Sequence, residues 1–305
     1  MSLRWALNFH IMKIIIPNPE NFERLKVRIK SGGCQNLHIL SDFDKTLTYR
    51  EINGVKTPSI ISLLRGGNHL TEDYAKKAKA LFEKYHPIET DPSIPLQEKK
   101  KAMQEWWETH NKLLIQSGLS KSDLEDIVKN EQVRFREGVP EFLDFLNQHN
   151  IPLIILSASG CGDAIQMFFE NIGKDYPNIY YITNQFIWDK NGKAISAKKP
   201  IIHSMNKDET ILKEIPKVYS VIRDRRNILL LGDSIGDLGM IKGFEYENLL
   251  KVGFLNFDCD KLRKEYEKNF DIVLEGDRDF NPVNNLIQDF FRRRTSKKTS
   301  KNTSL

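Results

Sequence analysis

The sequence predicts an α/β fold, with a doubly wound, mostly parallel sheet and an inserted domain of helices. Short apolar runs typical of buried parallel strands recur along the chain, and helical patterns lie between most of them. One long stretch in the first half has helical spacing without a convincing strand. The chain has 305 residues, 40% of them hydrophobic and 29% charged, which is enough to bury a sizeable sheet.

Six apolar runs are interpreted as buried strands of this sheet. They are residues 37–40, 151–156, 179–182, 228–231, 249–254 and 272–274. Helical patterns at residues 138–150 and 163–172 lie on either side of the second run. This alternation of strand and helix predicts parallel strands joined by crossover helices.

The stretch from residue 58 to residue 135 breaks the alternation, and we interpret it as an insert of three or four helices. Apolar and aromatic residues recur there at helical spacing, among them Tyr74, Ala78, Met103, Trp106 and Leu124. An insert after the first strand is in a position to cover the carboxyl ends of the strands, where open α/β sheets place their active sites.

The predicted domains are therefore an α/β core at residues 20–57 and 136–290, a helical cap at 58–135 and a basic, disordered tail at 291–305. The tail accounts for the net charge of +5, because residues 292–305 hold six Lys or Arg, and the rest has 40 basic and 41 acidic residues. A body this close to neutral disfavours nucleic-acid binding.

Three cysteines that lie far apart, with no membrane-length apolar run, indicate a cytoplasmic protein without a disulfide framework. The mildly apolar N-terminus is not interpreted as a signal peptide, because His10 and Lys13 interrupt it. We expect no membrane partner, and we expect a monomer.

The strongest local signal directly follows the first predicted strand, where Asp42 and Asp44 are two residues apart in the segment Ser41–Thr48. Two carboxylates that converge in a turn raise each other's pKa unless a cation lies between them. Mg²⁺ binds at sites with one or two carboxylates, water and a phosphate oxygen. The segment therefore predicts a metal-dependent phosphate site, although a single Asp at a strand end is as often a helix cap.

Two more predicted strands end in residues suited to the same chemistry. Asp233 and Asp237 follow the run at 228–231, with glycines that let backbone approach a ligand. The run at 151–156 ends in Ser157-Ala158-Ser159-Gly160, and hydroxyls with free N–H groups at a helix N-terminus suit a phosphate.

A lysine is needed to neutralise the phosphate. Lys207 is preferred to its rivals Lys198 and Lys199, because the segment His203-x-x-Asn206-Lys207 resembles, in its spacing, that of a known family of phosphohydrolases.

The order Asp-x-Asp-x-Thr, Ser, Lys and Gly-Asp-Ser-x-x-Asp resembles the haloacid-dehalogenase superfamily of phosphohydrolases over residues 35–290. Further segments resemble the pyrimidine 5′-nucleotidase (cytosolic 5′-nucleotidase III) family. They are Ile88–Pro92, Glu105–Trp107, Ile151-Pro152, His203–Lys207 and Leu231–Ser234. The resemblance implies a haloacid-dehalogenase-like core with a helical cap and a 5′-nucleotidase that hydrolyses nucleoside 5′-monophosphates such as CMP and UMP. Use of 7-methyl-GMP stays open.

The resemblance also implies roles for the acidic residues. Asp42 matches the nucleophile that forms an aspartyl-phosphate, and Asp44 matches the general acid and base. Asp233 matches a ligand of Mg²⁺, together with Asp42 and the backbone carbonyl of Asp44. Asp237 matches an outer-shell or lysine-supporting residue, and Ser234 is expected to support the same turn.

Phosphate binding is implied for Ser157, the backbone of Ala158, and Lys207. Thr46 is a further candidate, and both Thr46 and Ser157 have an alternative interpretation as plain cap or turn residues. This loop departs from the family pattern Ser-Ala-Gly-x-Gly-Asp because it is one residue longer. Cys161 in the loop has no evident base, which favours an inert thiol.

The cap is expected to select the substrate. Glu89 matches the carboxylate that recognises the base, with a solvated loop acid as the alternative. Trp106 and Trp107 are candidates for stacking on the base, and at least one of them is expected to pack inside the cap instead. His110 stands where the family usually has serine, which leaves the base preference open.

Other functions remain as alternatives to the nucleotidase. A small-metabolite phosphatase of the phosphoserine-phosphatase type would need neither the Glu89 segment nor the tryptophan pair. A nucleoside phosphotransferase would share the same intermediate. A catalytically silent binding protein is disfavoured, because Asp42, Asp44, Lys207 and Asp233 are all present.

Overall fold

The computed structural model describes residues 13–67, 69–207, 215–242, 245–257 and 259–291. Within these ranges the core is a seven-stranded sheet with the order β1-β11-β10-β9-β2-β5-β6. Its strands are β1 (Ile14–Ile15), β2 (Leu37–Ser41), β5 (Leu153–Leu156), β6 (Ile179–Ile182), β9 (Asn227–Gly232), β10 (Asn248–Leu255) and β11 (Ile272–Glu275). All pairs are parallel except β1 with β11.

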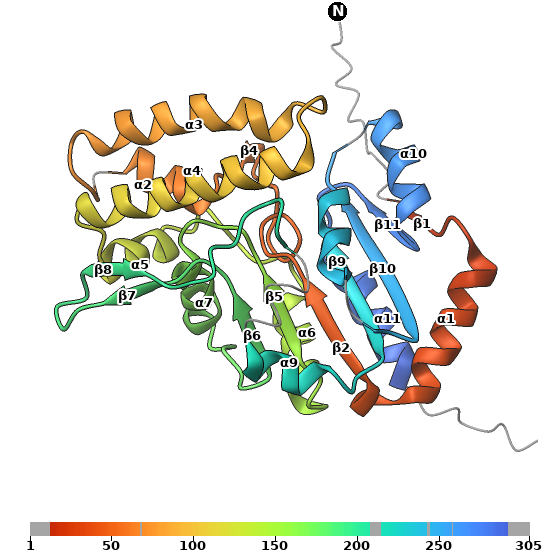
Figure 1. The fold of residues 1–305 in the computed structure, drawn as a ribbon. Helices are drawn as coiled ribbons and strands as arrows, with labels where there is room; N and C mark the ends of the chain where they lie inside the picture. The colour runs from red at the N-terminus through yellow and green to blue at the C-terminus, as the bar shows by residue number, and fades with distance from the viewer. Residues whose placement is uncertain (1–12, 68, 208–214, 243–244, 258, 292–305) are drawn as a thin grey trace, which may run out of the picture.

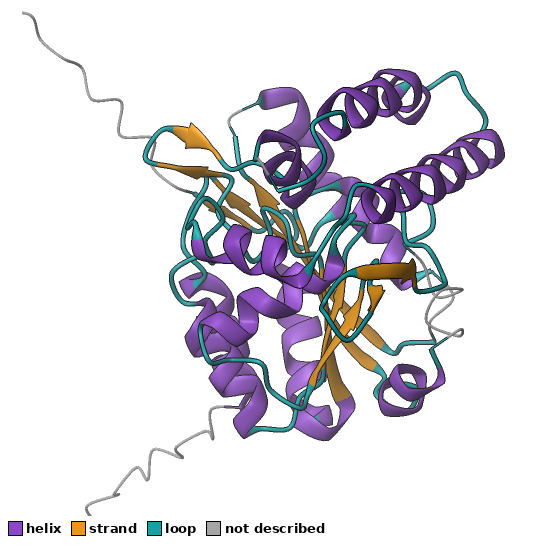
Figure 2. Ribbon diagram, turned by 90° about the vertical axis from the view of Figure 1, so that its left-hand side faces the viewer, coloured by secondary structure: helices purple, strands orange, loops and turns teal. Residues whose placement is uncertain are grey.

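The central strands are apolar on both faces because the sheet is buried between two layers (Figures 1 and 2). Successive side chains of a strand point to opposite faces. In β2, Ile39 belongs to one buried cluster and Leu40 to the other, and in β9 Leu229 and Leu230 divide in the same way. The predicted doubly wound α/β fold is confirmed, and each of the six predicted strands lies in this sheet.

Helices from different parts of the chain cover each face. One face packs against apolar residues of four helices: α1 (Pro19–Gly32), α6 (Val139–Gln148), α7 (Gly162–Asn171) and α11 (Asn281–Phe291). The other face packs against α9 (Pro216–Ile222), the short η2 helix (Ile235–Ile241) and α10 (Asp260–Asn269). A further short helix, η1 (Cys34–Asn36), leads into β2.

The chain direction across the sheet reverses between two central neighbours, β2 and β9. From β2 the chain continues to β5 and β6 on one side, and then returns through β9, β10 and β11 on the other. In open α/β sheets, ligands bind at such a switch point, beyond the carboxyl ends of the strands. The fold therefore places Asp42 and Asp233, which directly follow β2 and β9, side by side.

The stretch predicted as an insert contains four described helices: α2 (Ile60–Gly66), α3 (Tyr74–Thr90), α4 (Leu96–Gln116) and α5 (Lys121–Lys129). The long helices α3 and α4 pack against each other and lie above the carboxyl ends of the strands (Figure 1). Helix α5 instead packs against α7 of the core. The division of the chain into a core and a cap at 58–135 remains a prediction.

Two hairpins were not predicted from the sequence. The first, β3 (Glu51–Ile52) with β4 (Val55–Lys56), follows the segment that carries Asp42. The second, β7 (Phe186–Trp188) with β8 (Ala194–Ala197), is bound to the core by Asp163, which accepts hydrogen bonds from Phe186 N (2.8 Å) and Trp188 Nε1 (3.1 Å). Because β8 contacts α4, this hairpin connects the core to the helices above it.

Two sequence-based expectations concern the ends of the chain. Residues 1–12 and 292–305 lie outside the described residues, so the predicted N-terminal and tail properties remain predictions. Within the described ranges, every helix is too short or too polar to cross a bilayer.

Candidate active site

The floor of the site is built from the carboxyl ends of β2 and β9. Asp42 is only 5% exposed, and its backbone N–H donates to the carbonyl of Leu231 at 3.1 Å. Lys207 Nζ donates to Asp42 Oδ1 at 2.5 Å and to Asp237 Oδ1 at 3.3 Å. The structure thus brings together residues that are 165 positions apart in the sequence.

Asp237 links this lysine to the turn after β9. Its other carboxylate oxygen, Oδ2, accepts hydrogen bonds from the backbone N–H (3.0 Å) and the hydroxyl (2.9 Å) of Ser234, which forms a capping box at the start of η2. Burial disfavours the charged form of Lys207, but Asp42 and Asp237 outweigh it and hold its pKa above the ordinary value. Lys207 is therefore a fixed cation.

The floor of the site carries more carboxylates than the single positive charge of Lys207 can neutralise. Burial raises the pKa of Asp42 and of Asp44, and the carboxylates around Asp42 add to the effect there. Burial, together with Asp237, raises the pKa of Asp233 to about 7. Ligand atoms of Asp42, Asp233 and Asp237 lie within 4.8 Å of one another. The buried carboxylates of Asp42 and Asp237 and the partly buried one of Asp233 fit a divalent cation at this spacing, and the cation would offset their mutual repulsion.

The loop after β5 supplies small polar groups on one side of this floor. Ser157 is buried, and its hydroxyl accepts a hydrogen bond from Ser159 N at 3.2 Å. Asn184 holds the loop by donating to the carbonyl of Ser159 at 3.0 Å. Cys161 is buried, and burial raises the pKa of its thiol above the ordinary value, which fits the interpretation of an inert cysteine.

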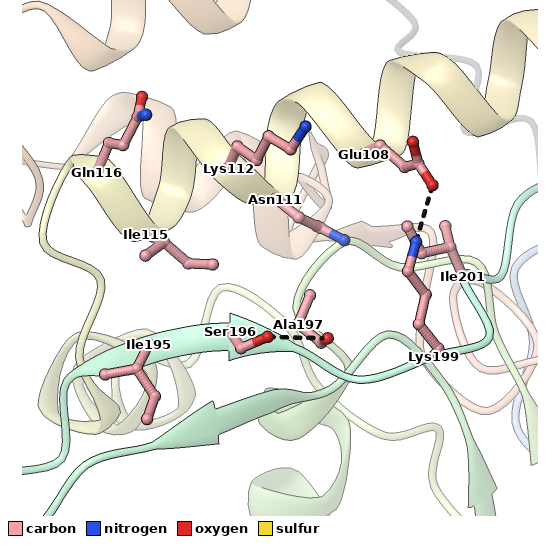
Figure 3. Close-up of a pocket in the computed structure, with 10 residues that line it drawn as sticks. All are labelled: Glu108, Asn111, Lys112, Ile115, Gln116, Ile195, Ser196, Ala197, Lys199 and Ile201. Atoms are coloured by element: carbon pink, nitrogen blue, oxygen red, sulfur yellow. Dashed lines mark hydrogen bonds and ion pairs between the residues drawn. The ribbon is translucent and has the colours of Figure 1, made fainter.

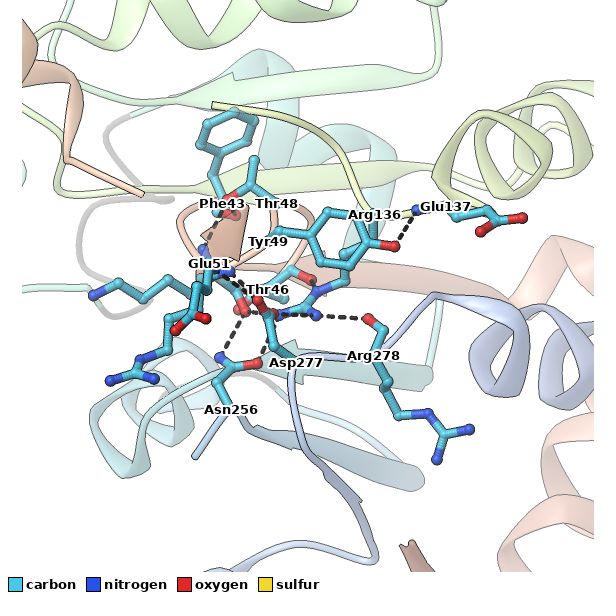
Figure 4. Close-up of polar contacts among 12 residues, drawn as sticks. Phe43, Thr46, Thr48, Tyr49, Glu51, Arg136, Glu137, Asn256, Asp277 and Arg278 are labelled. Atoms are coloured by element: carbon cyan, nitrogen blue, oxygen red, sulfur yellow. Dashed lines mark hydrogen bonds and ion pairs between the residues drawn. The ribbon is translucent and has the colours of Figure 1, made fainter. Parts of the chain in front are cut away.

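A buried arginine, Arg136, holds the loop that carries Asp44 (Figure 4). Arg136 has no exposed surface and donates to the carbonyls of Lys45 (2.5 Å) and Thr46 (2.9 Å). Its guanidinium also bonds Asp277 Oδ1 (2.8 Å) and Asn256 Oδ1 (2.7 Å). Lys45 adopts a positive φ of 61°, a conformation that costs a non-glycine residue about 1 kcal/mol. These hydrogen bonds stabilise it.

Thr46 is placed differently from the other candidates. It is buried and is absent from the described lining of the cavity above Asp42. Its carbonyl serves as an acceptor for Arg136. This placement favours the alternative interpretation of Thr46 as a turn residue.

A cavity of about 540 Å³ extends from the floor to the helices above it. Its wall includes Asp42, Asp44, Lys207 and Asp233 at one end and residues of α2, α3 and α4 at the other. The described residues that line it are Asp42, Asp44, Lys45, Ser59, Ile61, Arg65, Ala78, Phe82, His86, Glu89, Trp106, Trp107, His110, Ser157, Ala158, Ser159, Gly160, Ser204, Lys207 and Asp233. Arg65, Phe82, His86 and Ser204 were not among the predicted site residues.

Aromatic rings form much of the upper wall. Trp106 is 9% exposed and stacks on Tyr85 (centroids 5.8 Å apart) and Trp107 (5.9 Å), so it packs largely within the helices. Trp107 also stacks on His110, with ring centroids 5.6 Å apart. Burial, with a contribution from Arg65, lowers the pKa of His110 to about 4, so this ring is neutral near pH 7 and its Nε2 shares a 3.0 Å hydrogen bond with the hydroxyl of Tyr74.

Glu89 lies in the upper wall and is held from two sides. The hydroxyl of Ser204 donates to Glu89 Oε1 at 2.5 Å, and His86 Nδ1 lies 3.3 Å from Oε2. Ser204 follows the core segment at 201–203, so this bond joins the core to α3. The carboxylate lies on helix α3 and is held by two side chains, which favours a role in the wall over the alternative of a solvated loop acid.

The rival lysines point elsewhere. Lys198 Nζ donates to Gln185 at 2.9 Å, and Lys199 Nζ pairs with Glu108 at 2.7 Å in a groove between α4 and β8 (Figure 3). Of the three candidate lysines, Lys207 is the one that contacts Asp42.

Gly160 joins the two halves of the cavity, because the ring of Trp107 lies directly on it. A Cβ at this position would lie 2.3 Å from Cζ3 of Trp107 and 2.8 Å from Cδ1 of Ile61. We therefore expect Gly160→Ala to push Trp107 out of place and to lower kcat/KM for nucleotides by about tenfold or more.

The measurement compares CMP with p-nitrophenyl phosphate, which has no nucleoside and should be affected much less. Gly66→Ala is the matched control, because its Cβ would meet nothing within 4 Å. An equal loss on both substrates would contradict the role given to the Trp107 contact.

Comparisons with known proteins show to which family the chain is similar. Residues 45–291 match the family described as Pyrimidine 5′-nucleotidase (UMPH-1). The chain is 36% identical over 274 residues to the 7-methylguanosine phosphate-specific 5′-nucleotidase of Gallus gallus. This match covers 90% of this chain and 94% of that protein. It is 34% identical over 276 residues to the Homo sapiens protein of the same name, covering 90% and 91%.

A solved structure resembles the fold as a whole. Cytosolic 5′-nucleotidase IIIB bound to cytidine has a TM-score of 0.82 and 30% sequence identity, and the match covers 91% of this chain and 93% of that one.

Proposed function

The chain belongs to the pyrimidine 5′-nucleotidase family, and we propose from this premise that it hydrolyses nucleoside 5′-monophosphates such as CMP and UMP to nucleoside and phosphate. The observation that carries the proposal is the cavity itself. Asp42 lies beside Lys207 at its floor, and an aromatic wall with Glu89 lies at its other end. A phosphate at the floor would leave the base within reach of that wall.

Asp42 is the nucleophile in this proposal. One of its carboxylate oxygens attacks the phosphorus, the bond to the nucleoside O5′ breaks, and an aspartyl-phosphate forms. Asp44 gives its proton to the departing O5′ and then takes a proton from the water that hydrolyses the aspartyl-phosphate. Burial raises the pKa of Asp44, which favours the protonated form that the first step requires.

Lys207 and the loop after β5 hold the phosphate. The fixed positive charge of Lys207 lies next to the attacking carboxylate, where it stabilises negative charge on the phosphoryl oxygens. The Ser157 hydroxyl and the backbone of Ala158 line the same end of the cavity and are assigned to phosphate oxygens. Arg136 keeps Asp44 in place by holding the two carbonyls that follow it.

We propose Mg²⁺ as the cofactor. Asp42, Asp233 and the backbone carbonyl of Asp44 are the assigned ligands, and Asp237 lies close enough to join them or to support Lys207. When bound, Mg²⁺ supplies charge neutralisation for the transferred phosphoryl group. The close spacing of the three carboxylates supports a cation here, and the raised pKa of Asp233 agrees with it.

The base is assigned to the upper wall. The exposed part of Trp107 and its neighbours offers a stacking surface, a contact worth about 1–3 kcal/mol per base in other systems. Glu89 accepts hydrogen bonds, which suits an exocyclic amino group such as that of cytosine. The proposal also includes a cytoplasmic location, supported by the chain's likeness to a structure named as a cytosolic nucleotidase. A monomer is proposed as well, as expected from the sequence.

Phosphate release tests this function with UMP, CMP, dTMP, AMP, GMP, 7-methyl-GMP and phosphoserine, each with Mg²⁺ and with EDTA. We expect release from CMP and UMP that EDTA abolishes and added Mg²⁺ restores, because three carboxylates on the floor need a cation. Release from phosphoserine alone would replace the substrate with a small metabolite. Undiminished release in EDTA would contradict the metal site.

A further inference from the structure

One buried hydroxyl outside the cavity is bonded to the backbone of a proposed metal ligand. Tyr266 lies in α10 and is 5% exposed, and its hydroxyl donates to the backbone carbonyl of Asp233. A carbonyl oxygen can only accept a hydrogen bond, so the direction of this bond is fixed. Tyr266 is not among the described residues that line the cavity, so any influence it has on the site passes through Asp233.

The ring of Tyr266 is held by the layer of helices that covers this face of the sheet. It belongs to the buried apolar cluster there and packs on Phe270, one turn later in the same helix, with ring centroids 5.1 Å apart. One turn earlier, Arg263 pairs with Glu275 at the end of β11. Helix α10 also packs against β10 and β11. The hydroxyl therefore reaches Asp233 from a side chain that has little freedom to move.

The backbone at Asp233 has little stiffness of its own. Asp233 follows Gly232, the last residue of β9, and glycine restricts the backbone least of all residues. The glycine is required there, because a Cβ would lie 2.6 Å from the Cβ of Asp237.

The peptide unit that joins Asp233 to Ser234 is instead held from outside, at both of its ends. Its carbonyl accepts the hydrogen bond from Tyr266, and its N–H donates to Asp237 Oδ2 at 3.0 Å. Rotating this peptide plane would break both bonds. The two bonds therefore constrain the direction in which the Asp233 side chain leaves the backbone.

We propose that Tyr266 is a positioning residue for the metal, which holds Asp233 in the orientation that binds Mg²⁺. This inference rests on the proposed cofactor and adds a residue to its site. Removing a group that bonds a metal ligand from outside typically lowers metal affinity or activity by about 10–100-fold. The alternative is that the bond only satisfies a buried hydroxyl, since a buried tyrosine usually finds a partner. The two roles differ in one measurable quantity, the affinity for Mg²⁺.

Calorimetric titration with MgCl₂, on protein stripped of metal, tests the proposal without any nucleotide. Tyr266→Phe keeps the ring and removes only the hydroxyl, and we expect it to raise the dissociation constant for Mg²⁺ about tenfold. The matched control is Tyr181→Phe, because the hydroxyl of Tyr181 donates to Asp175 at 2.8 Å from the edge strand β6. The dissociation constant of this control should equal that of the wild type.

Phosphate release from CMP at increasing Mg²⁺ separates positioning from a general structural effect. For Tyr266→Phe we expect the Mg²⁺ concentration at half-maximal activity to rise about tenfold, while kcat at saturating Mg²⁺ stays within about threefold of the wild type.

Three results would overturn the proposal. The first is an equal Mg²⁺ dissociation constant for Tyr266→Phe and Tyr181→Phe, whatever their melting temperatures. The second is a wild type that binds no Mg²⁺, and the third is a loss confined to kcat. Because the dissociation constants are measured without a nucleotide, they are judged separately from phosphate release, which decides the proposed hydrolysis.

Discussion

Replacing Asp42 with asparagine is expected to lower kcat for CMP hydrolysis by about 10⁴-fold or more, which amounts to complete loss in most assays. The amide is nearly the same size as the carboxylate but is a very poor nucleophile, so the aspartyl-phosphate cannot form. Lys207 keeps Asp237 as a partner at 3.3 Å, so the fold should survive the change. Phosphate release and acid-quench detection of the phosphoenzyme provide the measurement.

Asp271→Asn is the matched control for this substitution. Asp271 is largely buried and accepts a hydrogen bond from Lys251 N at 2.9 Å. It lies at the amino end of β11, whereas the cavity lies beyond the carboxyl ends of the strands. We expect its activity to remain close to that of the wild type. If Asp42→Asn kept full activity while folding normally, the covalent mechanism would have to be abandoned.

The strands of the sheet could be predicted because residues that are neighbours in the sequence mark each of them. Each central strand is a short apolar run, and the two faces of the sheet bury alternate residues, as at Ile39 and Leu40. The hairpin β7–β8 was missed because its strands are short and divide between buried and exposed positions: Phe186 and Ala194 belong to the core, whereas Ile187 and Ile195 are exposed. The apolar run of β7, Phe186–Trp188, is only three residues long, which is too short to indicate a strand by itself.

The floor of the site could also be predicted, because Asp42, Ser157 and Asp233 each follow a predicted strand. Parallel strands bring such positions to one edge of the sheet. Arg65, Ser204 and Arg136 could not be found in this way. Ser204 meets Glu89 across 115 residues of sequence, and no repeating pattern marks it. Contacts of this kind depend on how helices α2, α3 and α4 lie over the sheet.

Arg136→Met is expected to cause the largest loss of stability, about 3–5 kcal/mol, because it removes one partner of a buried ion pair. Methionine fills much of the same space but removes a donor from the carbonyls of Thr46 and Arg278. Asp277 and the carbonyl of Lys45 each lose one donor as well, and keep those from Arg50 N, Glu51 N and Asn256. The free energy of unfolding from urea titration is the measurement. The substitution should also lower kcat more than it raises KM, because Asp44 directly precedes the carbonyls that Arg136 holds.

Two variants separate this role from a general effect of removing an arginine. Arg134→Met removes a half-exposed arginine that pairs with Glu131 at 2.9 Å, and surface pairs of this kind contribute about 0–1 kcal/mol. Arg136→Lys keeps the charge but has three donors in place of five, so we expect stability and kcat between those of Arg136→Met and the wild type. Equal unfolding free energies for Arg136→Met and Arg134→Met would show that the buried network does not hold the loop. In that case the position of Asp44 would depend on the packing of the loop around Phe43, whose ring contacts Phe135, Phe168 and Phe169.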